Sequence, residues 1–166
     1  MTNSDVSVKL TNKGRGVFAS RAFRKGETVV NGHQVEILTE RTSHSFQIDV
    51  DLHVELNEPA VLINHSCMPN TGVRNNQFGG YDFIALTGIA QGEEITWDYE
   101  TTEYISIAVA QCYCGAAACR SRTRGFKYLP VEIKNKYGEF IADYLKHNVS
   151  HEGKIEVSSD HYASIT

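Results

Sequence analysis

Apolar and polar residues alternate along several short stretches of the chain, and this period of two predicts β-strands. The longest alternation runs from Phe46 to Leu56, where six apolar residues are separated by polar ones. Because successive side chains of a strand point to opposite faces, the pattern predicts one long strand or two strands joined by a bend, with one face buried. Shorter apolar runs predict further strands at residues 6–10, 17–19, 28–30, 83–86 and 94–97.

One stretch near the C-terminus carries a helical pattern. It begins at Pro130, a residue suited to the first position of a helix. Apolar residues then recur at spacings of three and four, at Ile133, Tyr137, Phe140, Ile141, Tyr144 and Leu145. We therefore predict a C-terminal helix over residues 129–148 and a polar tail over residues 149–166. The expected fold class is β-rich α+β.

The composition is that of an ordinary globular domain, with 166 residues of which 41% are hydrophobic and 22% are charged. The net charge of −4 argues against wholesale nucleic-acid binding. No apolar run approaches the roughly 20 residues needed to cross a bilayer, and residues 1–5 lack the basic and apolar parts of a secretory signal. We expect an intracellular protein with no membrane partner, cytoplasmic in a prokaryote and able to act in the nucleus of a eukaryote. The sequence does not set the oligomeric state.

Three of the four cysteines, Cys112, Cys114 and Cys119, fall within eight residues, and the fourth is Cys67. In a reducing compartment such thiols serve metal binding or catalysis more often than disulfides. Four sulfurs satisfy the tetrahedral preference of Zn²⁺, and a Gly/Ala-rich loop leaves room for them to converge. The alternatives are two disulfides or unrelated buried thiols. We predict a zinc site that joins the middle of the chain to its C-terminal part.

Four motifs follow one another along residues 6 to about 128. They are Gly14–Ala19 (GRGVFA), Asn64–Asn70 (NHSCMPN), Gly92–Tyr99 (GEEITWDY) and the cysteine cluster at Cys112–Cys119. In this order they make the chain resemble the SET-domain protein lysine methyltransferases, which transfer a methyl group from S-adenosylmethionine to a lysine amine. The expected partner is accordingly a protein substrate that presents a lysine, such as a histone or another basic protein.

The resemblance implies a fold of small curved β-sheets with a C-terminal pseudoknot. It implies a SET domain over residues 1–110 and a zinc-bound post-SET loop over residues 111–128, as a self-standing unit. The pseudoknot is expected to bring Asn64 and His65 beside Tyr99.

The resemblance also implies roles for single residues. The residues that match cofactor-binding positions, or are candidates for them, are Gly14, Arg15, Gly16, Asn64, His65 and Phe126. From chemistry alone, Arg15 or Lys13 could pair with the cofactor carboxylate or remain a solvated charge. Tyr99 matches the catalytic tyrosine, whose hydroxyl can align the amine without acting as a general base. Trp97, at the family's phenylalanine/tyrosine switch, is expected to narrow the substrate channel.

Two runs of charge leave alternatives open. Residues 93–103 hold five acids and no base, which predicts an acidic channel rim that attracts a cationic substrate or else a solvated face. Residues 120–136 hold six basic residues and one acid, which predicts a solvated surface or a contact with nucleic acid or an acidic partner. The competing functional hypothesis is therefore a catalytically weak SET-like module that binds protein or nucleic acid through this basic stretch.

Overall fold

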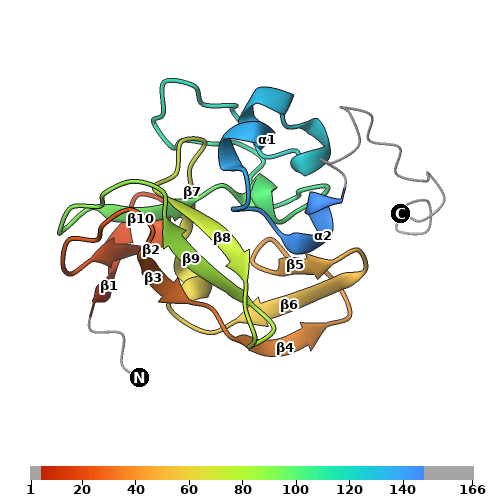
Figure 1. Cartoon of the computed structure of the whole chain (residues 1–166), viewed down its shortest axis with the longest axis horizontal. Coiled ribbons are helices and arrows are strands. Elements are labelled where there is room, and N and C mark those ends of the chain that lie inside the picture. Colours follow the sequence, from red (N-terminus) through yellow and green to blue (C-terminus); the bar gives the residue numbers. More distant parts are fainter. Residues whose placement is uncertain (1–4, 148–166) are drawn as a thin grey trace.

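The computed structural model describes residues 5–147. Within them, three small sheets lie beside a pair of short helices (Figure 1). The first sheet has the order β1-β2-β10-β7. Its strands are β1 (Val6–Thr11), β2 (Gly14–Ala19), β10 (Glu94–Trp97) and β7 (Asn64–His65). β10 runs antiparallel to β2 and parallel to β7, so this sheet joins three distant parts of the chain.

The other two sheets have three strands each. One has the order β3-β9-β8, built from β3 (Thr28–Asn31), β9 (Tyr81–Ala85) and β8 (Thr71–Asn75). The other has the order β4-β6-β5, built from β4 (Gln34–Leu38), β6 (Leu52–Leu56) and β5 (Phe46–Asp49). The long alternation at residues 46–56 is thus two antiparallel strands, with a turn at Val50 and Asp51.

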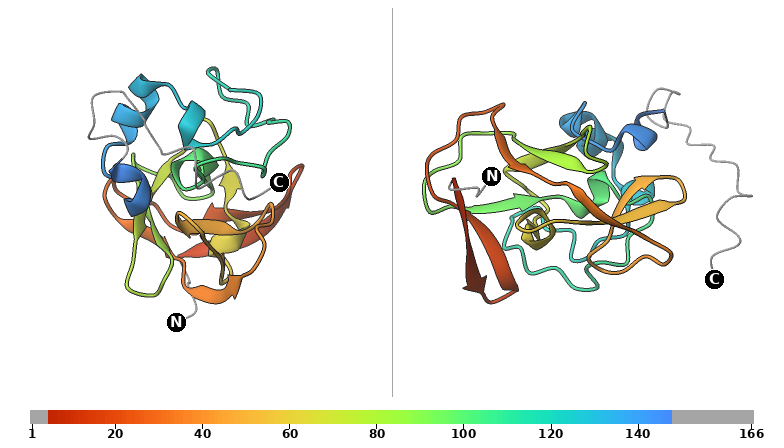
Figure 2. Two further views of the ribbon diagram at one scale, coloured as in Figure 1. Left: turned by 90° about the vertical axis from the view of Figure 1, so that its right-hand side faces the viewer. Right: turned by 90° about the horizontal axis from the view of Figure 1, so that it is seen from below.

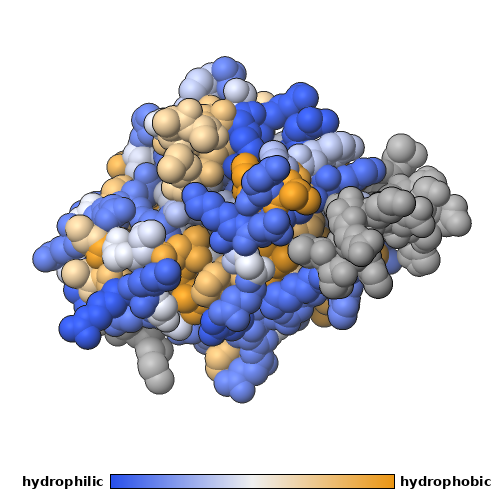
Figure 3. Space-filling view, turned by 45° about the horizontal axis from the view of Figure 1, so that its top comes forward, coloured by the Kyte–Doolittle hydropathy of each residue, from blue (hydrophilic) through white to orange (hydrophobic). Residues whose placement is uncertain are grey.

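The core lies where the three sheets meet. Trp97 of β10 stacks on Phe46 of β5 with ring centroids 5.3 Å apart and meets the edge of Phe83 of β9 at 5.6 Å. Offset stacking and edge-to-face contacts are the arrangements that aromatic rings prefer. All three side chains are at most 4% exposed. Of the residues in the period-two pattern, Phe46, Val54 and Leu56 are buried as predicted, whereas Val50 is exposed at the turn. The outer surface is mainly hydrophilic on the face shown in Figure 3, with small separate apolar patches.

The C-terminal helix predicted over residues 129–148 is two short helices instead. α1 (Val131–Tyr137) ends at Gly138, whose φ of 57° is left-handed and whose N–H bonds to the Lys134 carbonyl. α2 (Asp143–Lys146) follows after a break. Glycine favours this conformation at a helix end, and the break turns Ile141 and Leu145 into the core. The last predicted helical residue and the polar tail, residues 148–166, lie outside the described residues.

Three short 3₁₀ helices complete the described part of the chain, η1 (Ala60–Leu62), η2 (Tyr99–Thr101) and η3 (Phe126–Tyr128). In Figures 1 and 2, α1 and α2 lie together on one side of the sheets. The described residues contain no helix that is both long and apolar enough to span a membrane.

Candidate active site

The Asn64-His65 pair lies directly beside the segment that carries Tyr99. Asn64 pairs with Thr96 and His65 with Trp97 in the parallel ladder between β7 and β10, and Tyr99 begins η2 two residues later. We call β2, β7 and β10 the strand junction. It brings together two motifs separated by about thirty residues of sequence, as the resemblance predicted for Asn64, His65 and Tyr99.

His65 connects Tyr99 to a cysteine. Its Nδ1 accepts the backbone N–H of Tyr99 at 3.2 Å, and its Nε2 lies 3.4 Å from Sγ of Cys67. Burial lowers the pKa of His65 to about 4, so the ring is neutral at pH 7. Since Nδ1 is an acceptor, the single ring proton sits on Nε2 and points to the sulfur. His65 therefore positions the Tyr99 backbone and donates to Cys67 at the same time.

The Tyr99 hydroxyl is held by a backbone carbonyl. It donates to the Ile63 oxygen at 2.9 Å, and Trp97 Nε1 donates to the same oxygen at 3.2 Å. Burial raises the pKa of Tyr99 well above its ordinary value, and the Glu94 carboxylate adds to the shift. The hydroxyl therefore stays protonated at neutral pH. Because the hydroxyl proton is used in the hydrogen bond to the Ile63 carbonyl, the oxygen lone pairs can accept a hydrogen bond from a further donor.

Two cavities meet at Tyr99. The polar cavity, about 290 Å³, is lined by Asn12, Lys13, Asn64, His65, Tyr99, Val109, Gln111, Cys112, Tyr113 and Cys114. The aromatic cavity, about 20 Å³, is lined by Ser43, His44, Ser45, Phe46, Val61, Trp97, Tyr99, Glu103 and Ala108. Tyr99 is the residue that both cavities share, so its side chain forms part of the wall between them.

The glycine turn approaches Asn64 closely. A Cβ at Gly16 would lie 2.9 Å from Asn64 Nδ2 and from Glu94 Oε1, so a side chain there would displace both. Gly14 has a φ of +97°, which L side chains rarely adopt. Arg15 points elsewhere, since its guanidinium is about half exposed and pairs with Glu58 at 3.0 Å. Of the two basic residues weighed for the cofactor carboxylate, only Lys13 lines the polar cavity.

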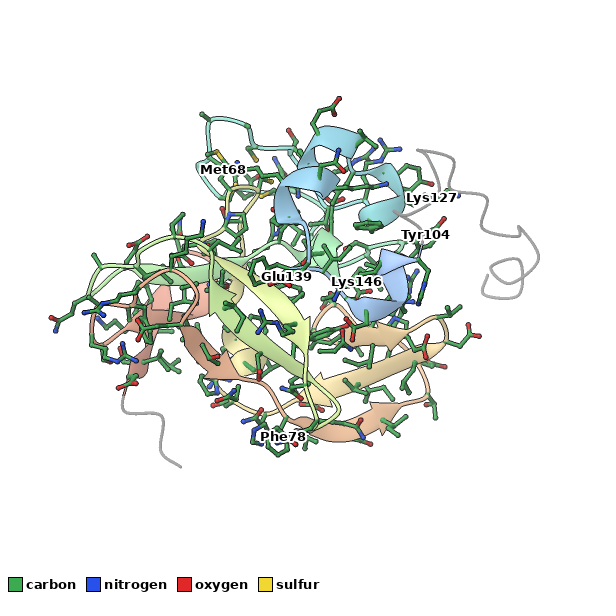
Figure 4. The ribbon with its side chains drawn as sticks, in the orientation of Figure 1. Met68, Phe78, Tyr104, Lys127, Glu139 and Lys146 are labelled. Atoms are coloured by element: carbon green, nitrogen blue, oxygen red, sulfur yellow. The ribbon has the colours of Figure 1, made fainter. Side chains whose placement is uncertain are left out.

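The four cysteines converge on one point. Their sulfur atoms all lie within 4.8 Å of one another, and Sγ of Cys67 and Cys112 are 3.9 Å apart. Tetrahedral zinc with Zn–S bonds of about 2.3 Å separates its sulfurs by about 3.8 Å. Backbone N–H groups of Arg120 and Ser121 also point at sulfurs, each at 3.4 Å. Such donors stabilise thiolate ligands, so the donor set fits zinc. Met68, the neighbour of Cys67, lies beside this cluster in Figure 4.

Residues 106–125, which we call the cysteine loop, contain no helix or strand. The loop folds back on itself through three backbone hydrogen bonds, Ser106 to Arg124, Thr123 to Val109 and Cys112 to Ser121, with N–O distances of 3.0, 3.0 and 2.7 Å. Gln111–Cys114 of this loop line the polar cavity, as do Asn64 and His65 of the strand junction.

Arg120 ties the cysteine loop to the residues on either side of Tyr99. Its Nη2 lies 2.7 Å from both carboxylate oxygens of Asp98, and its Nε donates to Glu100 at 2.7 Å. Tyr137 of α1 also donates to Asp98, at 2.8 Å. Asp98 and Glu100 are 1% and 2% exposed, so this is a buried network.

The expectation that all five acids of residues 93–103 lie at a solvated or channel rim is therefore wrong for Asp98 and Glu100, which are buried and line neither cavity. Glu103 is also buried, but it lines the aromatic cavity. Arg120 and backbone N–H groups replace the water that these carboxylates lose, and a carboxylate is buried only with such partners. Of the basic stretch, Arg120 belongs to this network, and Lys134 is 6% exposed with its Nζ 4.6 Å from the Phe126 ring centroid. The stretch is therefore not one continuous basic surface.

The protein family described as "SET domain" matches residues 14–100, just over half of the chain. This chain belongs to the SET-domain family. Its SET domain contains Tyr99, the Asn64-His65 pair, the glycine turn and Cys67, and the other three cysteines follow it, as in a post-SET segment.

Named relatives of this SET domain are histone-lysine N-methyltransferases. The "H3 lysine-4 specific" enzyme of Neurospora crassa is 38% identical over 86 residues, covering 48% of this chain and 6% of that protein. "Histone-lysine N-methyltransferase 2B" of Homo sapiens is 32% identical over 127 residues, covering 64% of this chain and 5% of its own length. "Histone-lysine N-methyltransferase Set2" of Drosophila melanogaster is 32% identical over 129 residues, covering 65% of this chain and 6% of that protein. The chain thus spans under a tenth of the length of these curated relatives.

Solved structures share the SET fold. The crystal structure of KRYPTONITE in complex with mCHG DNA and SAH has a TM-score of 0.56 and 26% identity, covering 70% of this chain and 28% of that one. KRYPTONITE in complex with mCHH DNA, H3(1-15) peptide and SAH has a TM-score of 0.54 and 25% identity, covering 70% of this chain and 29% of the KRYPTONITE chain.

The predicted site residues of this SET domain divide into two groups. Asn64, His65 and Tyr99 line the polar cavity, with Gly16 packed against Asn64, and Trp97 lines the aromatic cavity. Gly14, Arg15 and Phe126 line neither cavity, and Phe126 lies in the core with no exposed surface.

An aromatic residue does reach the polar cavity from the cysteine loop. It is Tyr113, which is 69% exposed. Sequence reasoning passed over Tyr113, although its position between two metal-ligand candidates ties it to the cluster.

Proposed function

We propose that this SET domain is an S-adenosylmethionine-dependent methyltransferase that acts on lysine side chains of a protein, with histones as the first substrate class to test. The observation that carries the proposal is the position of Tyr99 between a polar and an aromatic cavity. A cofactor bound in the polar cavity and a lysine amine entering through the aromatic cavity would meet at the Tyr99 hydroxyl. The names of the relatives, and the SAH and H3(1-15) peptide in the KRYPTONITE structures, support the same function.

The polar cavity is the proposed cofactor site. Asn64 and Lys13 supply polar groups, Gly16 keeps the turn close to Asn64, and Tyr113 supplies an aromatic face from the cysteine loop. S-adenosylmethionine, when bound, supplies a methyl group on a positively charged sulfur. We propose zinc at Cys67, Cys112, Cys114 and Cys119, where it would hold Gln111–Tyr113 against the cavity.

Tyr99 is the proposed catalytic residue, acting by orientation. Its hydroxyl proton is engaged by Ile63, which leaves lone pairs for an N–H of the substrate amine. Because burial raises the pKa of Tyr99, the hydroxyl is suited to accept this hydrogen bond as a neutral group. The amine nitrogen would then point across the wall toward the polar cavity, and alignment of the reacting atoms is the main requirement of an in-line transfer.

The aromatic cavity is the proposed lysine entrance. Phe46 and Trp97 give it apolar walls, which accommodate the methylene stem of lysine and lower the pKa of its amine by excluding water. The Trp97 indole is fixed by Phe46, Phe83 and the Ile63 carbonyl. We propose that this fixed ring limits how many methyl groups the product amine carries.

The competing hypothesis is a binding module that uses residues 120–136. The engagement of Arg120 by buried carboxylates and the burial of Lys134 weigh against it, because these two residues contact the protein interior. Binding to nucleic acid therefore stays outside the proposal, although the KRYPTONITE structures contain DNA. Action on histones would place the protein in the nucleus of a eukaryote.

The test is methyl transfer by the purified chain. Radiolabelled S-adenosylmethionine is incubated with the protein and core histones, and in parallel with a mixed protein extract. We expect label on lysine residues, identified by tandem mass spectrometry. Measurable cofactor binding with no label on any protein would contradict the enzyme and favour the binding module.

A further inference from the structure

A third cavity, larger than the two at Tyr99, lies on the face of the β4-β6-β5 sheet that points away from the core. We call it the sheet-face cavity, and its volume is about 470 Å³. In the sheet register both Leu38 of β4 and Gln47 of β5 pair with His53 of β6. These three side chains form a row across the sheet and line the floor of the cavity.

Two connecting segments make the walls. Thr39–Arg41 follows β4 on one side, and Ile105 and Ile107 of the segment after η2 lie on the other. Arg41 Nη1 donates to the Ile105 carbonyl at 2.8 Å and ties the walls together. The turn residues Val50 and Asp51 complete the lining.

The sheet-face cavity is a neighbour of the aromatic cavity. The same two segments continue from one to the other, since residues 43–45 and Ala108 line the aromatic cavity. Glu103 also lines the aromatic cavity, while its carboxylate accepts the Gln47 N–H at 2.9 Å and lies 3.7 Å from His53 Nε2. A chain that inserts a lysine at Tyr99 therefore passes close to the sheet-face cavity.

The polar groups of the cavity are unevenly satisfied. Gln47 is saturated, because its side chain accepts from Tyr104 and donates to Val50 and Asp49. His53 Nε2 is, within residues 5–147, the one buried side-chain polar atom that lacks a hydrogen-bond partner. This atom is enclosed by protein and lies 3.7 Å from the Glu103 carboxylate, so the exposed carboxylates of the lining are the groups open to a ligand.

The charges of the cavity favour a cation. Glu40 and Asp51 line it, and both are exposed. Within residues 5–147, neither carboxylate forms an ion pair. Arg41 is the basic residue of the lining and hydrogen-bonds the neutral Ile105 carbonyl, so two carboxylates face one guanidinium in the lining. Apolar lining comes from Leu38, Val50, Ile105 and Ile107, and Thr39 adds a polar residue.

We propose that the sheet-face cavity binds a basic side chain, arginine or lysine, that flanks the target lysine in the protein substrate. The proposal rests on the proposed function. The apolar residues contact the methylene stem, as they do for other long basic side chains. Asp51 and Glu40 attract the charged end, and the ring of His53 lies on the cavity floor, where it reports on binding.

The first test measures kcat/KM on synthetic 12-residue peptides that contain one lysine and either arginine or glutamine at each flanking position in turn. We expect about a fivefold preference for arginine at one or two positions, the size of one partly exposed ion pair. The double variant Glu40→Gln, Asp51→Asn should bring that ratio close to one. Glu55→Gln removes an exposed acid from the same sheet outside the cavity, and it should keep the preference. Equal kcat/KM for arginine and glutamine at every position in the wild type would overturn the proposal.

The second test does not depend on methyl transfer. Lysine-free peptides with arginine or glutamine are titrated into the cofactor-free chain, and the imidazole signals of His53, assigned with His53→Gln, are followed by NMR. We expect the arginine peptide to shift these signals at lower concentration than the glutamine peptide, and the double variant to remove the difference. If the signals respond in this way but no protein is methylated, the cavity proposal holds, because the cavity binds a basic segment. Only the proposed methyltransferase function is then contradicted. Unchanged His53 signals with both peptides would overturn the site.

Discussion

The strand junction and the cysteine loop hold Tyr99 from two sides, and they are built in different ways. The junction joins distant segments by backbone pairing, as where Thr96 faces Asn64 and Trp97 faces His65. The cysteine loop has no helix or strand, and its links to the rest of the chain run through side chains, chiefly Cys67 and Arg120. Backbone pairing tolerates many side-chain changes, whereas side-chain links depend on single residues.

This difference matters for the site because the polar cavity has one wall from each region. Asn64 and His65 belong to the junction, and Gln111–Cys114 belong to the loop. Loss of the loop should therefore open the cavity while the sheets stay folded. The predictions below test this division, beginning with the largest expected effect.

Removal of one zinc ligand should have the largest effect. Structural zinc contributes on the order of 10 kcal/mol to the folding of small domains. We expect Cys119→Ser to lose one zinc per chain by native mass spectrometry, to raise amide exchange in residues 106–125 and to weaken cofactor binding. The far-UV circular dichroism of the sheets should change little.

Ala117→Ser is the matched control, since it adds a hydroxyl to the same loop at an exposed position and removes no sulfur. It should retain zinc and cofactor affinity. A metal-free wild-type protein that is fully active would contradict the zinc assignment, and unfolding of the sheets with the loop would contradict the division into two regions.

Arg120→Met should come next, with a loss of about 3–5 kcal/mol in the free energy of unfolding. It leaves Asp98 and Glu100 buried without their cation. Urea denaturation measures the loss, and Arg122→Met, an exposed arginine of the same loop, is the control. Equal effects of the two substitutions would show that the buried network does not join the loop to the junction.

Tyr99→Phe should lower turnover about a hundredfold, or about 3 kcal/mol, the usual effect of losing one preorganised polar contact at a reacting centre. Folding should lose at most about 1–2 kcal/mol, since the ring stays and one hydrogen bond to Ile63 is lost. Single-turnover rate, cofactor affinity and melting temperature of the same variant separate the two effects. Tyr128→Phe alters an exposed tyrosine that lines neither cavity, and it should change none of the three. A wild-type rate for Tyr99→Phe would mean that another residue is catalytic.

Trp97→Phe should have the smallest effect on rate, and its main result should be in the product. A smaller ring enlarges the aromatic cavity, so we expect the wild type to add few methyl groups and the variant to add more. Intact-mass analysis of a substrate driven to completion measures the distribution. Dominant trimethylation by the wild type would show that the indole does not limit the product. The lost contacts with Phe46 and Ile63 should cost about 1–3 kcal/mol of stability.

Several features of the fold could not be predicted from the local sequence. β4 (Gln34–Leu38) lacked a signal because its residues are mostly exposed, with Val35 at 65% and Ile37 at 58%, so it has no buried face to produce a pattern. β8 (Thr71–Asn75) contains Gly72, which packs against Phe140 where a Cβ would lie only 2.6 Å away, and glycine weakens any strand pattern. The helix break at Gly138 depended on how Ile141 and Leu145 reach the core.

The sequence by itself determined the strands with a strict period of two, the four cysteines that converge and the motif residues Asn64, His65 and Tyr99, because these signals are local or consist of rare residue types. Only the tertiary structure decided which charges are buried. Asp98 and Glu100 look like solvated acids until the chain brings Arg120 from about twenty residues away. It also placed Tyr113 at the polar cavity and Phe126 in the core. Burial of a charged or aromatic side chain depends on partners from distant segments, and no local pattern encodes them.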